Sequence, residues 1–369
     1  MRARLPGESC DTVFVADADM VAEVLRAEGS IPKRKNAPTW EYYRNKNNVS
    51  MGLVFEDGDE WERLRSAVQT PIFPPKNAHA YCPAVGPATT QVMDVVEDAV
   101  TTIILGQRLG ALDVEPNPLA LEMIRAVYAQ IVTTGPVLLM PEFGSFLGQV
   151  LQRDATITRR DLLSTAVDLL LAGIDITSRS LLSTMNLLGR YPNVQAKLRD
   201  EIYAVVGTDP NAQLDASHLA KFKYLKNVLK EASRVFMVVP INTRFLARDA
   251  VVGGYALPQG TAVLLASETI AHSPKYFADP ETFSPDRWDA KDIHPFASLP
   301  FGLGSRMCVG RRVSEMEMTV ILAHLLGRFE ILPAPAPQDI IFNVLLSTAG
   351  PMPVKFRPLD AKSVATTVS

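Results

Sequence analysis

The sequence predicts a mainly α-helical protein with small β-sheets, an α+β fold built around one long central helix. Three observations favour this class. A helical pattern runs without a break from residue 158 to residue 190. Helical patterns cover much of the remaining chain, and short strand patterns with Gly and Pro turns lie between residues 239 and 265. The 369 residues are 47% hydrophobic, so they can bury a large core as one big domain or two ordinary ones.

The elements follow in order along the chain. Residues 11–30 predict a short strand and then a helix, with Asp17 as its N-cap. Further helices are expected over 91–109, 119–140 (interrupted near Gly135), 193–206, 222–236 and 310–328. Further strands are expected over 239–244, 251–265, 329–332 and 340–346. Residues 71–90 are rich in Pro, Gly and Ala and predict a loop.

The central helix has clear start and stop signals. Residues 158–161 fit a capping box, and Pro192 ends the pattern. At the usual rise per residue the helix would be roughly 50 Å long. Because its middle is apolar on nearly every side, we expect it to pass through the core.

Charge and cysteine usage exclude several classes of function. A net charge of −3 argues against binding of nucleic acid or acidic membranes by the molecule as a whole. The three cysteines, Cys10, Cys82 and Cys308, are too few and odd in number for a disulfide scaffold, and they favour a reducing compartment. No run of about 18 apolar residues predicts a transmembrane helix, and the first residues lack the pattern of a presequence.

The stretch from Phe301 to Gly310 reads F-x-x-G-x-R-x-C-x-G. Its glycines allow a sharp backbone turn, and Arg306 would place a cation beside Cys308, which favours the thiolate. The following helix would favour the thiolate further through its N-terminus. A thiolate in such a loop can serve as an axial ligand of haem iron. The alternative is a buried structural cysteine in a Gly-rich turn.

These ten residues resemble the haem-ligand loop of the cytochrome P450 family. The resemblance implies the P450 fold, with a single large haem domain over residues 11–357 and disordered tails at 1–10 and 358–369. It implies haem b as the cofactor and Cys308 as the metal ligand. The loop residues expected to bind the cofactor are Phe301, Gly302, Arg306, Cys308 and Gly310.

Three residues outside the loop resemble the family's propionate-binding positions. Trp61 and Arg65 are spaced i and i+4, so they share a helix face and offer two donors for a carboxylate. Arg244 matches another position that contacts a haem propionate. The alternative for the first pair is a tryptophan anchor packed beneath a surface arginine.

The middle of the central helix resembles the family's oxygen-activation motif. Ala172 and Gly173 would let dioxygen and a flat cofactor approach the backbone, while Asp175 and Thr177 would relay protons. The sequence departs from the family at Ile176, where a hydroxyl residue is expected directly after the acid. Proton delivery would then depend on Thr177, or on Asp175 with water. A third possibility is that proton delivery is impaired. The alternative is a core helix with a stray buried aspartate.

Glu231 and Arg234 match the family's E-x-x-R motif, and Arg287 matches a second arginine. Two guanidiniums on one buried carboxylate would form a bidentate clamp that orients the Cys308 loop. Without Arg287, the pair Glu231 and Arg234 would be a solvated helix pair worth about 0.3–0.5 kcal/mol.

A basic patch is expected on the cysteine side of the haem, formed by Lys226, Lys230, Arg311 and Arg312. These positions resemble those of the mitochondrial branch, which implies an adrenodoxin-type ferredoxin as electron donor, steered by opposite charge. The alternative is that the lysines are merely solvated. The resemblance also implies a location at the matrix side of the inner membrane and leaves a peripheral membrane contact open.

The leading hypothesis is a monooxygenase that inserts one oxygen atom of O2 into a lipophilic, sterol-like substrate. The region between Arg65 and Ala172 is shorter than in the family, and the first elements are lacking, so a truncated form is indicated. A second hypothesis is therefore a haem-binding protein with little or no turnover. A third is a haem-free helical interaction protein.

Overall fold

The structure is a computed structural model that describes residues 1–4, 11–34, 38–72, 74–76, 150, 153–209, 212–333, 340–343, 345–348 and 354–359. The helices predicted over 91–109 and 119–140 lie outside these residues, as do Cys10 and Cys82. The expected shortening of the chain before Ala172 also falls mostly on residues outside this part.

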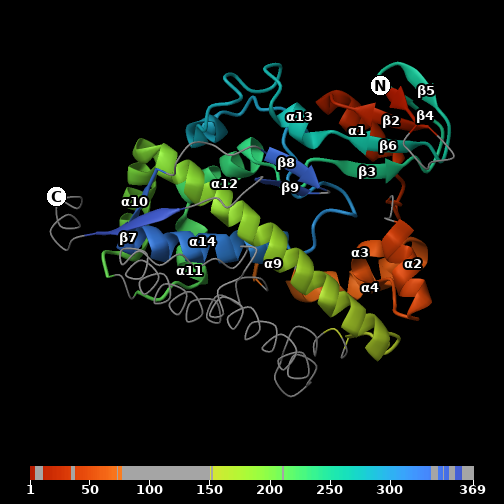
Figure 1. The fold of residues 1–369 in the computed structure, drawn as a ribbon, viewed down its shortest axis with the longest axis horizontal. Coiled ribbons are helices and arrows are strands. Elements are labelled where there is room, and N and C mark those ends of the chain that lie inside the picture. The colour runs from red at the N-terminus through yellow and green to blue at the C-terminus, as the bar shows by residue number, and fades with distance from the viewer. Residues whose placement is uncertain are drawn as a thin grey trace, which may run out of the picture.

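One long helix, α9 (Arg159–Arg190), crosses the molecule from the region of α3 (Gly52–Phe55) and α4 (Gly58–Ile72) to α10 (Pro192–Val206) (Figure 1). Thr158 is its N-cap, and its side chain and that of Asp161 form a reciprocal capping box. The predicted start, end and capping of the central helix are therefore confirmed.

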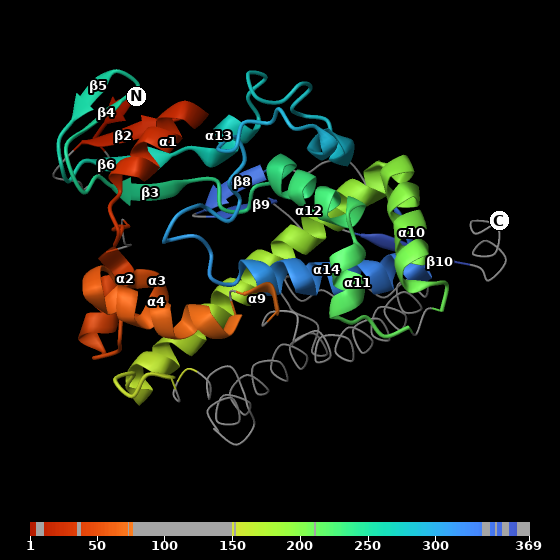
Figure 2. The same ribbon diagram turned by 180° about the vertical axis from the view of Figure 1, so that it is seen from behind.

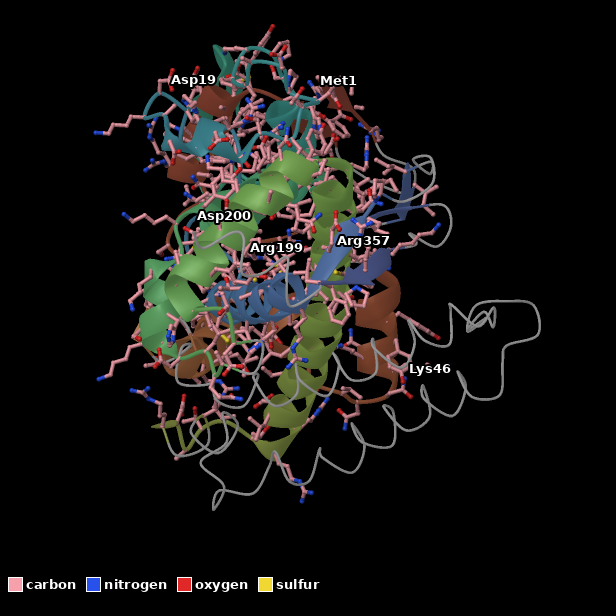
Figure 3. The ribbon with its side chains drawn as sticks, turned by 90° about the vertical axis from the view of Figure 1, so that its left-hand side faces the viewer. Met1, Asp19, Lys46, Arg199, Asp200 and Arg357 are labelled. Carbon is pink, nitrogen blue, oxygen red and sulfur yellow. The ribbon has the colours of Figure 1, made fainter. Side chains whose placement is uncertain are left out.

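A four-stranded sheet lies at one end of the molecule. Its order is β1 (Arg2–Ala3), β2 (Thr12–Val15), β6 (Ala262–Leu265) and β3 (Asn242–Phe245). Only β2 and β6 pair in parallel, with Thr12 opposite Ala262. Helix α1 (Ala18–Ala27) follows β2, capped by Asp17 as predicted, and buries Val21 and Val24 against the sheet residues. Met1 and Asp19 lie at this end, and Lys46 lies away from it (Figure 3).

The largest hydrophobic cluster lies among the helices. It joins the C-terminal half of α9 to α10, α12 (Tyr224–Val235) and α14 (Arg311–Arg328). Figure 2 shows α12 and α14 on the face of α9 that points toward the viewer. The strands β7 (Phe329–Leu332) and β10 (Lys355–Pro358) pair antiparallel beside this cluster, with Leu332 opposite Lys355.

Short elements complete the described part of the chain. The sequence did not predict α2 (Pro38–Lys46), α11 (Ala216–Lys221), α13 (Ser267–Ala271) or the 3-10 helix η2 (Pro285–Asp289). The predicted strands within 251–265 appear as β4 (Ala250–Val252), β5 (Tyr255–Leu257) and β6. No helix among the described residues is long and apolar enough to cross a membrane.

Two predictions about the ends of the chain were wrong. The single strand expected over 340–346 is a hairpin of β8 (Ile340–Asn343) and β9 (Leu345–Thr348), which pair antiparallel with Asn343 opposite Leu345. Residues 2 and 3 form a strand paired with β2, so this part of the 1–10 tail is ordered. Ion pairs from Arg2 and Arg4 to Asp11 reinforce that pairing.

Candidate functional site

The loop before α14 holds Cys308 in a tightly folded turn. Gly302 (φ 68°) and Gly304 (φ 77°) both adopt the left-handed conformation that favours glycine. The backbone N–H of Cys308 donates to the carbonyl of Phe301 at 2.9 Å, and the N–H of Gly302 donates to the carbonyl of Leu299 at 3.0 Å. The loop therefore folds back on itself immediately before the first turn of α14.

Gly304 also makes room for a carboxylate from a distant part of the chain. A Cβ at this position would collide with Oε1 of Glu28, the C-cap residue of α1. The side chain of Glu28 is buried. The second glycine of the loop is thus required both by its backbone conformation and by the close approach of Glu28.

Cys308 follows this turn, and the protein groups around it shift the pKa of its thiol. The residue is exposed, yet burial raises the pKa of its thiol, and the charges of Arg65 and Arg34 oppose that rise only in part. Neighbouring cations thus act in the expected direction, but they are Arg65 and Arg34, and burial outweighs them.

The side chain of Arg306 is fixed by partners outside the Cys308 loop. Its Nε donates to the carbonyl of Pro32 at 2.7 Å, and its Nη1 and Nη2 donate to the carbonyl of Glu56 at 3.0 and 3.1 Å. Nη2 also pairs with Asp57. The guanidinium stacks over the ring of Trp61, with 3.8 Å from its central carbon to the ring centroid.

Arg244, on β3, is almost fully buried. Its Nε pairs with Glu28, its Nη1 donates to the carbonyl of Thr243 at 2.8 Å, and its Nη2 donates to the carbonyl of Leu303 at 3.3 Å. A guanidinium has five N–H groups. Two N–H groups of Arg244 therefore have no acceptor among the residues that the structure describes.

Two more arginines complete what we call the arginine cluster (Arg34, Arg65, Arg244 and Arg306). Arg34 donates from Nη2 to the carbonyl of Arg306 at 2.5 Å. Its Nε is buried and has no hydrogen-bond partner within the described part of the chain. Arg65, on α4, is buried and donates from Nε to Oε1 of Gln69 at 2.8 Å.

The arginine cluster is electrostatically crowded. Burial lowers the pKa of Arg34 to about 9, and the charges of Arg244, Arg306 and Arg65 lower it further. Burial also lowers the pKa of Arg65 to about 10 and that of Arg306 to about 10. All three pKa values remain above neutrality, so the guanidiniums keep their charges.

The unsatisfied donors indicate the kind of group that this cluster would accept. Among the described residues, Glu28 pairs with Arg244 and Asp57 pairs with Arg306. The Nε of Arg34 and two N–H groups of Arg244 still need acceptors, and anionic acceptors suit guanidinium donors best. A haem has two propionates, so the residues present fit this cofactor.

Sequence reasoning missed Arg34. Its only signal was the basic, loop-like character of the segment that begins at Lys33. Nothing in the sequence indicates that this segment packs against the loop of Arg306, which follows it by 272 positions. The contribution of Arg34 depends on a tertiary contact, and pattern analysis along the chain does not detect such contacts.

On α9, the motif residues lie along the middle of the helix. Ala172 is half-buried and Gly173 is exposed. A Cβ at Gly173 would meet no heavy atom of the described residues within 4 Å, so there is open space beside this position. The backbone of Asp175 is part of α9, and its side chain lies outside the described residues.

Thr177 has a specific partner. Its hydroxyl lies 3.1 Å from the hydroxyl of Ser314 on α14, and either group can donate. Ile176, one position earlier, is half-buried. The hydroxyl expected to relay protons is therefore engaged between two helices.

A buried ion pair fixes the first half of α9 in place. Arg44 on α2 donates to the carbonyls of Ser50 and Met51 at 2.8 and 2.5 Å, and its Nη2 pairs with Asp168. A Cβ at Gly52 (φ 67°) would collide with the carboxylate of Asp168. This network positions the helix against α2 and α3, and the sequence analysis did not detect it.

Glu231, Arg234 and Arg287 meet in one network. Arg234 donates to the two carboxylate oxygens of Glu231 at 2.8 and 3.0 Å, and Arg287 donates to Oε1 at 2.8 Å. The indole of Trp288, which the sequence analysis did not assign, donates to Oε2 at 2.8 Å, and the backbone of Ser284 donates to Oε1 at 3.1 Å. The carboxylate thus accepts five hydrogen bonds.

The four basic residues expected to bind a partner differ in their surroundings. Lys226 and Lys230 on α12 are exposed. Arg311 donates to Glu315 at 2.8 Å and Arg312 donates to Glu315 at 3.4 Å. A shared carboxylate therefore offsets part of the charge at the start of α14.

Comparisons with known proteins agree with this geometry. The family model described as "Cytochrome P450" matches residues 4–102 and 119–356. The chain is 31% identical to 25-hydroxyvitamin D-1 alpha hydroxylase, mitochondrial, of Rattus norvegicus, over 89% of this chain and 80% of the relative. It is 30% identical to Cytochrome P450 27C1 of Aquarana catesbeiana, over 93% and 78%. It is 28% identical to sterol 26-hydroxylase, mitochondrial, of Oryctolagus cuniculus, over 89% and 76%. This chain therefore belongs to the cytochrome P450 family, and it is a monooxygenase whose cofactor is haem b.

Proposed function

We propose that this chain hydroxylates a lipophilic, sterol-like substrate in mitochondria, with electrons from an adrenodoxin-type ferredoxin and with residues 11–357 as its haem domain. The names of two relatives support the substrate class and the location, because they are mitochondrial hydroxylases of vitamin D and sterol. A matrix-side position at the inner membrane is part of the same proposal.

In this proposal Cys308 is the axial ligand of the haem iron, and the arginine cluster with Trp61 holds the propionates. Bound haem would supply the iron at which O2 is activated. The observation that carries the proposal is the exposed Cys308 in its glycine turn, near an arginine cluster in which the Nε of Arg34 and two N–H groups of Arg244 have no acceptor among the described residues. The loop residues Phe301, Gly302 and Gly310 would shape the surface beneath the haem.

The side of the haem away from Cys308 would face α9. Ala172 and Gly173 leave the space in which O2 and substrate would lie, as the open volume beside Gly173 supports. We assign proton delivery to Asp175 with water, and Thr177 to a supporting role, because the hydroxyl of Thr177 is bonded to Ser314. The Glu231 network would hold the chain beneath the haem in place.

The ferredoxin would bind on the side of Cys308. Lys226 and Lys230 are exposed and carry no carboxylate partner among the described residues, so their charge is available to an acidic protein. Arg311 and Arg312 contribute less charge, because both contact Glu315. Such a surface would mainly accelerate association at low ionic strength.

The haem assignment is tested by carbon monoxide binding to the reduced protein. We expect the Soret band that is typical of a thiolate ligand in the wild type and its loss in Cys308→Ala. Cys308→Ser, which keeps an oxygen at the same place, should bind haem without the thiolate band. An unchanged spectrum in both variants would refute Cys308 as the ligand.

The partner assignment is tested by reduction kinetics with adrenodoxin-type ferredoxin, its reductase and NADPH. Lys226→Gln combined with Lys230→Gln should slow reduction and flatten its dependence on salt. Lys46→Gln is the matched control, because Lys46 is an exposed lysine on α2, away from α12 (Figures 1 and 3). Equal kinetics in the double variant and the control would remove the ferredoxin from the proposal.

A second candidate function is a haem-binding protein with little or no turnover. The engaged hydroxyl of Thr177 and the apolar Ile176 favour it, since both weaken the usual route for protons. Product analysis with vitamin D and sterol substrates separates the two. Electron uptake without any hydroxylated product would favour the second candidate, whereas hydroxylation that survives in Thr177→Ala would favour the first.

A further inference from the structure

Glu28 is a buried carboxylate that the chain places inside the arginine cluster. It ends α1, and its side chain is 5% exposed. One oxygen pairs with Arg244, and the other lies against Gly304, where only a residue without a Cβ fits. Glu28 therefore contacts both the β3 arginine and the turn that precedes Cys308.

The pairing with Glu28 determines how Arg244 is oriented. The remaining acceptors of Arg244 are two backbone carbonyls, of Thr243 and Leu303. Among the described residues, Glu28 is the one charged acceptor of Arg244, and hydrogen bonds to charged groups are stronger than those to neutral ones. Without this carboxylate, the guanidinium would be held by two neutral contacts, one of them at 3.3 Å.

Glu28 also determines the charge of the cluster. Burial raises the pKa of its carboxyl, and the charges of Arg244, Arg34 and Arg306 oppose that rise. If Glu28 were neutral, Asp57 would be the remaining carboxylate paired with the cluster in the described residues, and the surroundings of the haem would be more positive by one charge.

We propose that Glu28 is a positioning residue for the haem, which aims the free N–H groups of Arg244 at a propionate and places one negative charge inside the arginine cluster. This role rests on the proposed contact between the arginine cluster and the propionates. Glu28 acts through Arg244 and the loop, and it takes no part in the chemistry.

Two variants separate the two parts of this role. Glu28→Ala removes the anchor of Arg244, so we expect haem to transfer to an acceptor protein about tenfold faster or more. Glu28→Gln keeps an oxygen that can accept from Nε but removes the charge. Because the iron gains an electron on reduction, the extra positive surroundings should favour the ferrous state and raise the reduction potential.

Glu23→Gln is the matched control. Glu23 lies on the same helix, but its carboxylate accepts from the backbone N–H of Gly253 at 2.7 Å, away from the cluster. We expect wild-type haem release and a wild-type potential in this variant. If Glu28→Ala fails to fold, the nearly isosteric Glu28→Gln still tests the charge through the potential.

Wild-type haem release in Glu28→Ala, or an unchanged potential in Glu28→Gln, would overturn the inference. Neither result would affect the proposed function, provided that the wild type binds haem with the thiolate spectrum. If the wild type itself binds no haem through sulfur, the proposed function fails first, and these variants are not needed to show it.

Discussion

Two groups of buried arginines in this molecule differ in how completely their N–H groups are hydrogen-bonded. In the Glu231 network, Arg234 is fully buried and makes five hydrogen bonds, two to Glu231 and three to the carbonyls of Ala271, Pro280 and Thr282. A guanidinium has five N–H groups, so each has an acceptor. In the arginine cluster, the Nε of Arg34 is buried and has no partner among the described residues.

The difference separates a structural network from a binding site. A complete network stabilises one arrangement of the chain and offers nothing to a ligand. An incomplete network is costly in the empty protein and becomes favourable when a ligand supplies the acceptors. The same residue type therefore holds the fold together at Glu231 and would hold a cofactor beside Cys308.

The largest expected effect comes from removing the carboxylate of the complete network. Glu231→Ala would leave the buried guanidinium of Arg234 and that of Arg287 without an anion. Loss of one member of a buried ion pair costs roughly 3–5 kcal/mol. We expect little soluble protein and a much lower free energy of unfolding, measured by chemical denaturation. Glu281→Ala, at an exposed site, is the control, and equal stability of the two variants would contradict the comparison.

Removal of an arginine from the incomplete network should affect haem binding more than the stability of the haem-free protein. Arg34→Met takes away a poorly satisfied charge, so the haem-free protein should be as stable as the wild type or more stable. Haem release should be about tenfold faster, because a charge-assisted contact to a propionate is lost.

Arg34→Lys provides the matched control, since it keeps the charge and loses the planar fork of donors. Its haem release should fall between those of the wild type and Arg34→Met. If Arg34→Met destabilises the haem-free protein as strongly as Glu231→Ala does, the two networks are alike and the distinction fails.

The smallest expected effect concerns a buried polar group in neither network. His324 on α14 is buried, and its Nε2 has no partner in the described part of the chain. Burial lowers the pKa of its imidazole, and the charge of Arg328 lowers it further. The folded protein thus disfavours the imidazolium, whereas the unfolded chain accepts a proton near its ordinary pKa of 6.5.

Stability from this histidine is therefore complete above pH 6.5 and falls as the pH decreases toward the folded pKa. The loss has an upper limit of about 1.4 kcal/mol per pH unit. Melting temperatures of the wild type and His324→Gln at neutral and mildly acidic pH measure it. The variant should lose less stability on acidification than the wild type. Equal losses in the two proteins would show that other groups determine the pH dependence of stability.

Much of the fold could be predicted from local patterns. The central helix has its capping box at Thr158 and its stop at Pro192, and both signals lie within a few residues of the ends of α9. The contact between Glu231 and Arg234 follows from their spacing on one helix. Such features depend on neighbours in sequence, so the sequence alone contains them.

The parts that could not be predicted depend on contacts between distant segments. Glu28 and Arg244 are 216 positions apart, and Arg44 and Asp168 are 124 apart. Trp288 follows the predicted Arg287 directly, yet its bond to Glu231 requires the 3-10 turn that the sequence did not indicate. The charge balance of the arginine cluster became visible only when these segments were placed together.

The central claim is that the arginine cluster is kept incomplete for two propionates. Titration of the haem-free protein with haem and with haem dimethyl ester tests it most directly, because the ester has the same ring without the two charges. We expect the ester to bind at least about a hundredfold more weakly, with much of that difference removed in Arg34→Met. Equal affinity of the wild type for haem and the ester would contradict the account.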